Sequence, residues 1–204
     1  MVNNKIIFFL PIISFFLLIS CSKESDQIID YKDNYLTEEG GEIINAMIGE
    51  PSNLVAMIAG DSASSAIAAN IFNTLIKYDE NLNHAPELAS QWIISDDQKT
   101  ITFKLKENLF WADGTPLTSD DVLFTWRLVT DPNTRTPYAS DYLLVKDAQT
   151  PNKQTFTVTY EQNYAPALDT WASLQILPKH VLKDEDINNT FFSRKPTGSG
   201  YYQL

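Results

Sequence analysis

The most apolar part of the chain is its start. A single positive charge at Lys5 precedes an almost uninterrupted apolar run from Ile6 to Ile19. These 14 residues are fewer than the roughly 20 that a helix needs to cross a bilayer, and they suit the apolar core of a secretory signal. The pattern therefore predicts a signal segment over residues 1–20.

Cys21 is the only cysteine of the chain, and it directly follows this segment. The preceding Leu18-Ile19-Ser20 makes the sequence resemble a bacterial lipobox, in which the cysteine thiol is alkylated by diacylglycerol before the signal is removed. We therefore predict a lipid anchor at Cys21. Residues 21–40 are polar and lack apolar periodicity, so they are predicted to form a flexible tether. An uncleaved anchor with an incidental cysteine is the alternative.

Further along, apolar residues recur with the periods of strands and helices. The first half of this body is predicted to contain a strand over 42–48 and a buried helix over 66–75, with capping hydroxyls at 62–65. A short strand is expected over 76–78. Pro86 is expected to open a helical turn.

A hairpin signal follows at residues 92–105. The segment 92–95 precedes the turn Asp-Asp-Gln-Lys, and apolar residues then alternate over 100–105. Thr118 is expected to begin a helix, with Asp121 three residues later in a capping-box arrangement. A second alternating strand is predicted over 156–160. Strands and helices therefore interleave, which indicates a mixed α/β fold class. Four aromatic residues on periodic faces are predicted to be core: Trp92, Phe103, Trp126 and Phe156.

Charge and composition exclude several function classes. The formal net charge is −11, whereas a nucleic-acid-binding protein needs Lys and Arg to displace counterions from phosphates. One cysteine excludes an intrachain disulfide framework and a cysteine-built zinc site. The two histidines lie far apart in the sequence. We therefore expect no nucleic acid, no metal and no cofactor.

No residues in the chain form a recognisable catalytic motif. His84 is expected in a solvated loop and His180 in the first turn of a helix. Adjacent carboxylates at 96–97, 120–121 and 184–186 fit a turn, a helix N-terminus and a solvated end. Gly198-Ser199-Gly200 lacks the third glycine of a dinucleotide fingerprint. Abundant aromatic residues without acid–base machinery favour ligand recognition over an enzyme.

The order of short motifs resembles the N-terminal part of the family 5 extracellular solute-binding proteins, the oligopeptide and dipeptide receptors of ABC importers. Residues 71–134 contain, in sequence, L-x-x-Y-D, P-x-L-A-x-x-W, W-x-D-G-T-P-x-T-x-x-D-V and D-P-x-T. PYAS at 137–140, LPKH at 177–180 and the closing GSGYYQL agree as well. The resemblance implies a periplasmic-binding-protein type II-like fold, which is two-lobed with an extra small domain.

The resemblance also implies how the chain is divided. Residues 41–72 would begin the first lobe, residues 73–172 would form the small second domain, and residues 173–204 would return to the first lobe. Only the N-terminal portion of the family fold is expected here, with the opposing lobe outside these residues.

The function implied by the resemblance is capture of extended oligopeptides or dipeptides for import, by a monomer held to the cell envelope by the lipid on Cys21. It would face the periplasm or the exterior and dock on ABC permease subunits. The loop Gly60-Asp61-Ser62 and Tyr138 match positions that reach the ligand in relatives. Other cargoes, namely a nickel chelate, haem or an oligosaccharide, stay open, as does a surface adhesion lipoprotein with the same scaffold.

Overall fold

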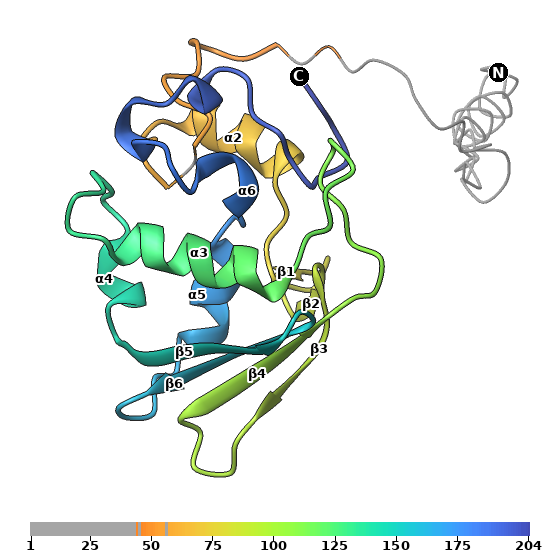
Figure 1. The fold of residues 1–204 in the computed structure, drawn as a ribbon, viewed down its shortest axis with the longest axis vertical. Coiled ribbons are helices and arrows are strands. Elements are labelled where there is room, and N and C mark those ends of the chain that lie inside the picture. The colour runs from red at the N-terminus through yellow and green to blue at the C-terminus, as the bar shows by residue number, and fades with distance from the viewer. Residues whose placement is uncertain (1–43, 45, 56) are drawn as a thin grey trace, which may run out of the picture. The chain divides into compact units, whose positions relative to one another are not determined.

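The computed structural model describes residues 44, 46–55 and 57–204. The chain divides into two units, residues 1–44 and 45–204, and the description below concerns the second (Figure 1). The predicted signal segment, the tether and Cys21 lie outside the described residues.

A four-stranded antiparallel sheet is the largest element of this unit. Its strand order is β3-β4-β6-β5, and the strands are β3 (Ala89–Ile94), β4 (Thr100–Leu105), β5 (Val145–Asn152) and β6 (Thr155–Tyr160). The predicted hairpin is confirmed, because Trp92 pairs with Phe103 across β3 and β4. The predicted strand at 156–160 is β6, which lies between β4 and β5.

The two central strands place apolar side chains on one face and threonines on the other. Ile101, Phe103 and Leu105 of β4 are buried, as are Phe156, Val158 and Tyr160 of β6. On the opposite face Thr102 lies 3.3 Å from Thr157, hydroxyl to hydroxyl. This alternation is typical of an antiparallel sheet that is covered on one side only.

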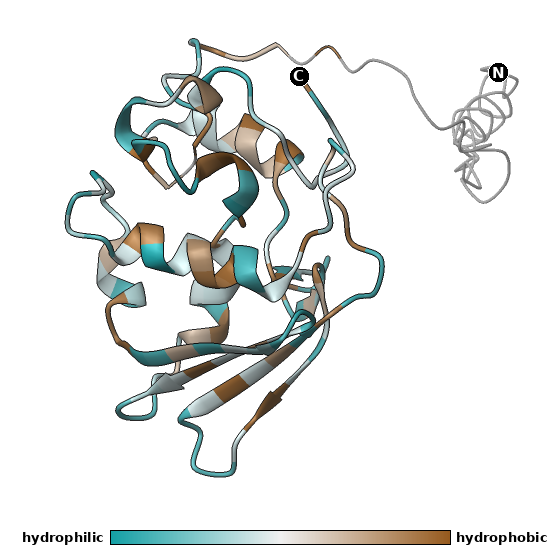
Figure 2. Cartoon of the chain, viewed as in Figure 1, coloured by the Kyte–Doolittle hydropathy of each residue, from teal (hydrophilic) through white to brown (hydrophobic). Residues whose placement is uncertain are grey.

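Helices cover the apolar face (Figure 1). They are α3 (Ser119–Thr130), the short α4 (Ala139–Tyr142) and α5 (Ala167–Ser173). Trp171 of α5 is fully buried, and its ring lies edge-on to Phe156 with a centroid distance of 5.1 Å. The capping box predicted for α3 is confirmed, because the Thr118 backbone N–H donates to the Asp121 carboxylate at 2.8 Å. Figure 2 shows how apolar and polar residues alternate along α3.

The early and late parts of the chain pack together around α2 (Ser62–Ile71). Phe72 contacts Phe192, and the Leu54 backbone N–H donates to the Ser193 carbonyl. This region also contains α6 (Lys179–Leu182) and two 3-10 turns, η2 (Ile187–Asn189) and η3 (Phe191–Ser193).

Gly198 and Gly200 explain why α2 ends at Ile71 rather than at residue 75. The backbone N–H groups of Ser199 and Gly200 donate to the Ile71 carbonyl at 3.0 and 2.7 Å. A Cβ at Gly198 would lie 2.1 Å from that carbonyl oxygen, so only glycine permits this approach. The Gly-Ser-Gly segment is therefore a close backbone contact at the end of a helix.

Two expectations about local structure were wrong, and one strand was not predicted. No strand forms at residues 44 and 46–48. No helical turn forms at 87–89; instead β1 (Ile76–Tyr78), which was predicted, pairs with β2 (His84–Pro86), and β3 begins at Ala89. The polar strand β5 was not predicted, because its order comes from pairing with β6 rather than from its own alternation. Among the described residues, no helix combines the length and apolar character needed to cross a membrane.

Candidate functional site

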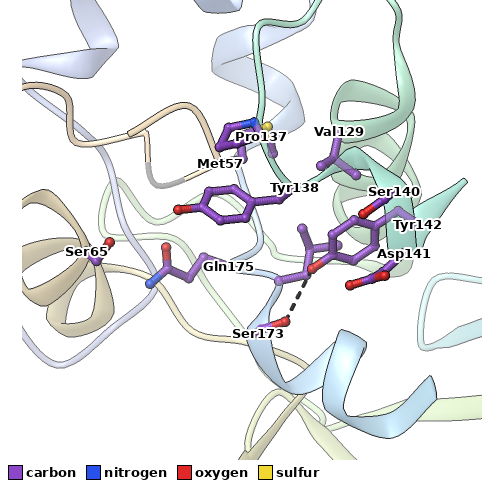
Figure 3. A pocket seen from close by; sticks show the side chains of 11 residues that line it. Met57, Ser65, Val129, Pro137, Tyr138, Ser140, Asp141, Tyr142, Ser173 and Gln175 are labelled. Atoms are coloured by element: carbon purple, nitrogen blue, oxygen red, sulfur yellow. Dashed lines mark hydrogen bonds between the residues drawn. The ribbon is translucent and has the colours of Figure 1, made fainter. Parts of the chain in front are cut away.

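A hollow of about 460 Å³ opens where three separate parts of the chain meet beside Val129 of α3 (Figure 3). Met57 and Ser65 line it from the loop before α2 and from α2 itself. Residues 137–138 and 140–142 line it from the start of α4, and residues 173–175 from the end of α5. The volume falls within the range usual for ligand pockets.

Tyr138 forms part of this wall. Its side chain is 44% exposed, and its hydroxyl donates to the backbone carbonyl of Ala59 at 3.3 Å. The phenol oxygen keeps lone pairs for another donor, and the ring is half open to solvent. Tyr138 is therefore held in place while its surface stays available, as a ligand contact requires.

The loop Gly60-Asp61-Ser62 lies next in sequence to the carbonyl that Tyr138 contacts. The structure thus brings the two predicted contact regions together. Gly60 and Ser62 are exposed, but none of the three residues lines the hollow. Ser65, one turn further along α2, does so instead.

Asp61 has a structural role as the N-cap of α2. Its carboxylate accepts hydrogen bonds from the Ser64 backbone N–H at 2.8 Å, the Ser64 hydroxyl at 2.7 Å and the Ser52 hydroxyl. The bond from Ser52, followed by those from Ser64, holds the pKa of Asp61 well below its usual range. Its charge is therefore already engaged by the fold.

Gln175 presents an unused acceptor at the hollow. Its side-chain carbonyl oxygen is buried and receives no hydrogen bond within the described part of the chain. The backbone that follows Gln175 is held by two hydrogen bonds. The Ile176 N–H donates to the carbonyl of Asn73, just after α2, and the Leu177 N–H donates to the Thr125 hydroxyl of α3. Figure 3 shows the amide reaching toward Ser65, below the Tyr138 ring. Sequence reasoning missed Gln175, although an amide within the apolar run 174–177 was a usable signal.

Tyr142 closes the floor of the hollow. It is 5% exposed, and its hydroxyl donates to the Thr170 carbonyl at 3.1 Å and lies 3.4 Å from the Ser173 hydroxyl. Burial raises the pKa of Tyr142, and the negative charge of Asp141 adds to this rise. Tyr142 is thus a neutral, fixed part of the wall.

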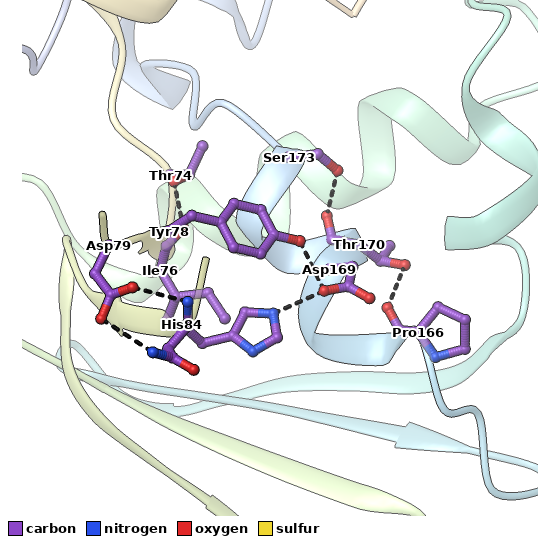
Figure 4. Close-up of polar contacts among 10 residues, drawn as sticks. Thr74, Ile76, Tyr78, Asp79, His84, Pro166, Asp169, Thr170 and Ser173 are labelled. Carbon is purple, nitrogen blue, oxygen red and sulfur yellow. Dashed lines mark hydrogen bonds and ion pairs between the residues drawn. The ribbon is translucent and has the colours of Figure 1, made fainter. Parts of the chain in front are cut away.

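The sequence suggested that His84 lies in a solvated loop, but the structure places it elsewhere. It stands on β2, and its Nε2 lies 2.8 Å from the Asp169 carboxylate of α5 (Figure 4). The Tyr78 hydroxyl donates to the same oxygen at 2.7 Å, and these two bonds lower the pKa of Asp169. The cluster joins the β1–β2 hairpin to α5, so tertiary contact explains the position of this histidine.

The other candidate groups have structural partners. His180 lies in the first turn of α6, as predicted, with Nε2 2.7 Å from the Asp113 carboxylate. Asp121 accepts from the Thr118 and Lys179 backbone N–H groups, while burial raises its pKa. Within the part of the chain that the structure describes, no three His, Cys, Asp or Glu side chains gather as metal ligands.

Comparison with known proteins places this architecture among binding proteins. The family model "Bacterial extracellular solute-binding proteins, family 5 Middle" matches residues 83–204. The oligopeptide-binding protein AppA of Bacillus subtilis is 29% identical over 205 residues, which cover 96% of this chain and 37% of AppA.

Solved structures share the fold. The substrate-binding protein CtaP of Listeria monocytogenes matches with a TM-score of 0.73 at 29% identity, over 81% of this chain and 34% of CtaP. NikZ of Campylobacter jejuni, solved in complex with Ni(L-His), matches with a TM-score of 0.70 at 27% identity, over 76% of this chain and 31% of NikZ. These neighbours are type II periplasmic binding proteins with mixed α and β content. The chain spans about a third of the length of the curated relatives it matches.

Proposed function

The chain belongs to family 5 of the bacterial extracellular solute-binding proteins, and from this membership we propose that it captures oligopeptides for an ABC importer. The family is one of solute-binding proteins, and the proposed chemistry is recognition without covalent change. The match to AppA covers 96% of this chain. AppA is an oligopeptide-binding protein and has been solved with a nonapeptide. Peptide is for this reason the first cargo to test.

The observation that carries the proposal is the position of Tyr138. A half-exposed aromatic ring at the wall of a hollow offers a ligand both a flat apolar surface and a phenol oxygen. Its anchoring bond to Ala59 fixes the ring without using its acceptor capacity. We propose Tyr138 as a direct peptide contact, with the loop Gly60-Asp61-Ser62, which is exposed at Gly60 and Ser62, forming the rim.

The remaining parts of the proposal concern organisation and partners. Residues 41–72 and 173–204 contribute to one lobe, and residues 73–172 form the small domain. An opposing lobe encloses the ligand, and permease subunits in the membrane receive the closed form. Residues 1–20 direct export, residues 21–40 form the tether, and the lipid on Cys21 holds the protein at the cell envelope. Contacts between the N-terminal and C-terminal segments, such as Leu54 with Ser193, support the division into a shared lobe.

The experiment is calorimetric titration of the protein with a mixture of short peptides. Tyr138→Ala is expected to weaken binding about tenfold, because a central aromatic contact is typically worth more than about 1 kcal/mol. Tyr201→Ala is the matched control, since Tyr201 is 83% exposed and does not line the hollow. Equal affinity of the Tyr138 variant and the wild type would remove Tyr138 from the site.

A nickel chelate is the second candidate. The likeness to NikZ, solved with Ni(L-His), favours it among the other cargoes. Among the described residues, no histidine or cysteine lines the hollow, so those that do would hold the chelate through its organic part. Titration with Ni(L-His) decides between the two cargoes: heat from the chelate and none from peptides would replace the peptide proposal.

A further inference from the structure

Apolar groups, hydroxyls, one amide and one carboxylate line the hollow. Among the described residues, Asp141 is the one charged residue in its lining, and no Lys, Arg or His side chain lines it. The hydroxyls of Ser65, Ser140 and Ser173 can rotate to donate or accept. The wall therefore has a formal charge of −1, with nothing positive in the lining to balance it.

Asp141 is available to a ligand. It is exposed at the start of α4 and has no ion pair or side-chain hydrogen bond with any described residue. This distinguishes it from Asp61, whose carboxylate is engaged by Ser52 and Ser64. Asp141 lines the hollow next to Tyr142, which forms its floor.

Gln175 adds a second acceptor that lacks a donor. Leaving a buried carbonyl without a hydrogen bond destabilises the protein, and a donor from a ligand would remove that penalty. The phenol oxygen of Tyr138 is a third acceptor beside it. A ligand that carries positive charge and N–H donors would suit these acceptors, which lie at different points of the hollow.

We propose that this hollow takes a cationic group of the ligand, an ammonium or a guanidinium, with Asp141 as its counter-ion, while Gln175 accepts from another N–H of the same ligand. The inference rests on the proposed function, because it assigns a charge preference to the same peptide site. Two sources supply this chemistry: a Lys or Arg side chain, or the N-terminal amine of a peptide. The net charge of −11 attracts either one at long range.

The test uses four pentapeptides and isothermal titration of the protein together with its opposing lobe. Ala-Lys-Lys-Lys-Ala is compared with its norleucine counterpart Ala-Nle-Nle-Nle-Ala, each with a free or an acetylated N-terminus. Norleucine keeps the length of the side chain and removes its charge. An effect that follows lysine identifies a basic side chain, and one that follows the free amine identifies the N-terminus.

Asp141→Asn is expected to weaken binding of the cationic peptides about threefold to fivefold, the range for a partly exposed ion pair. It should leave the acetylated norleucine peptide unaffected. Asp96→Asn is the control, because it makes the same charge change in the 95–100 turn, away from the lining residues. Gln175→Leu should weaken binding of the cationic peptides about fivefold and keep the side-chain size.

The results separate this inference from the proposed function. A wild-type protein that binds all four peptides equally, or an Asp141→Asn variant that weakens all four alike, would overturn the charge preference and leave peptide capture standing. A wild-type protein that carries the opposing lobe and binds none of the four would overturn peptide capture and the charge preference with it.

Discussion

Replacing Trp171 with alanine tests the packing that holds the helices on the sheet. Trp171 is fully buried, and its ring contacts Phe103, Phe156 and Tyr142 at centroid distances of 6.0, 5.1 and 6.1 Å. Its indole N–H donates to the Tyr160 hydroxyl at 3.0 Å. The change therefore empties the centre of the core and also removes the donor to a buried hydroxyl.

The expected cost is large. Truncating a buried Trp to Ala typically lowers the free energy of unfolding by about 3–5 kcal/mol. The Tyr160 hydroxyl would lose its donor in a place where burial already raises the pKa of Tyr160 to about 12. We therefore expect the upper part of that range, about 4–5 kcal/mol. For a chain of this size the melting temperature should fall by about 10–20 °C.

The assay is urea unfolding followed by far-UV circular dichroism, with the slope m checked for constancy. Trp126→Ala is the internal comparison. Trp126 was predicted to be core, but it is only partly buried at the margin of the core, and its indole donates to the Tyr142 carbonyl at 3.2 Å. Its loss should cost about half as much as that of Trp171. A Trp171→Ala variant within about 1 kcal/mol of the wild type, or less affected than Trp126→Ala, would refute this account of the core.

Three further changes test other parts of the chain. Gly198→Ala should lower stability by about 2–3 kcal/mol, because its Cβ would meet the Ile71 backbone, whereas Gly60→Ala has open space and should be neutral. Equal melting temperatures for the two would contradict this. The lowered pKa of Asp61 means that its ionised form stabilises the fold above about pH 4 and that this contribution is lost as the pH falls further. Asp61→Ala should be less stable at pH 7 in thermal melts and lose less stability on acidification; an unchanged pH profile would exclude the cap. Cys21→Ser should stay unprocessed and unlabelled by a lipid precursor, and normal labelling would rule out the anchor.

The candidate site could be found from the sequence only in part. Tyr138 and the loop at Gly60 were identified through motif resemblance, and the structure brings them together through the Ala59 carbonyl. Asp141 was missed because it is an ordinary residue until its surroundings are known, and Gln175 was missed although its amide interrupts an apolar run. The free carboxylate and the buried, unbonded carbonyl become visible only when α4 and the end of α5 face the same hollow.

Local patterns determined the elements whose order depends on neighbours in the sequence. The β3–β4 hairpin, the inward face of β6 and the start of α3 follow from alternation and from a capping box, so the sequence by itself specified them. Tertiary contact decided the rest. Helix α2 ends at Ile71 because residues 199 and 200 take its carbonyl, β5 is ordered by pairing with β6, and His84 is held by Asp169. Ile71 lies more than 80 residues from its partners at 199 and 200, and so does His84 from Asp169. A local sequence pattern spans too few residues to include both partners of either contact.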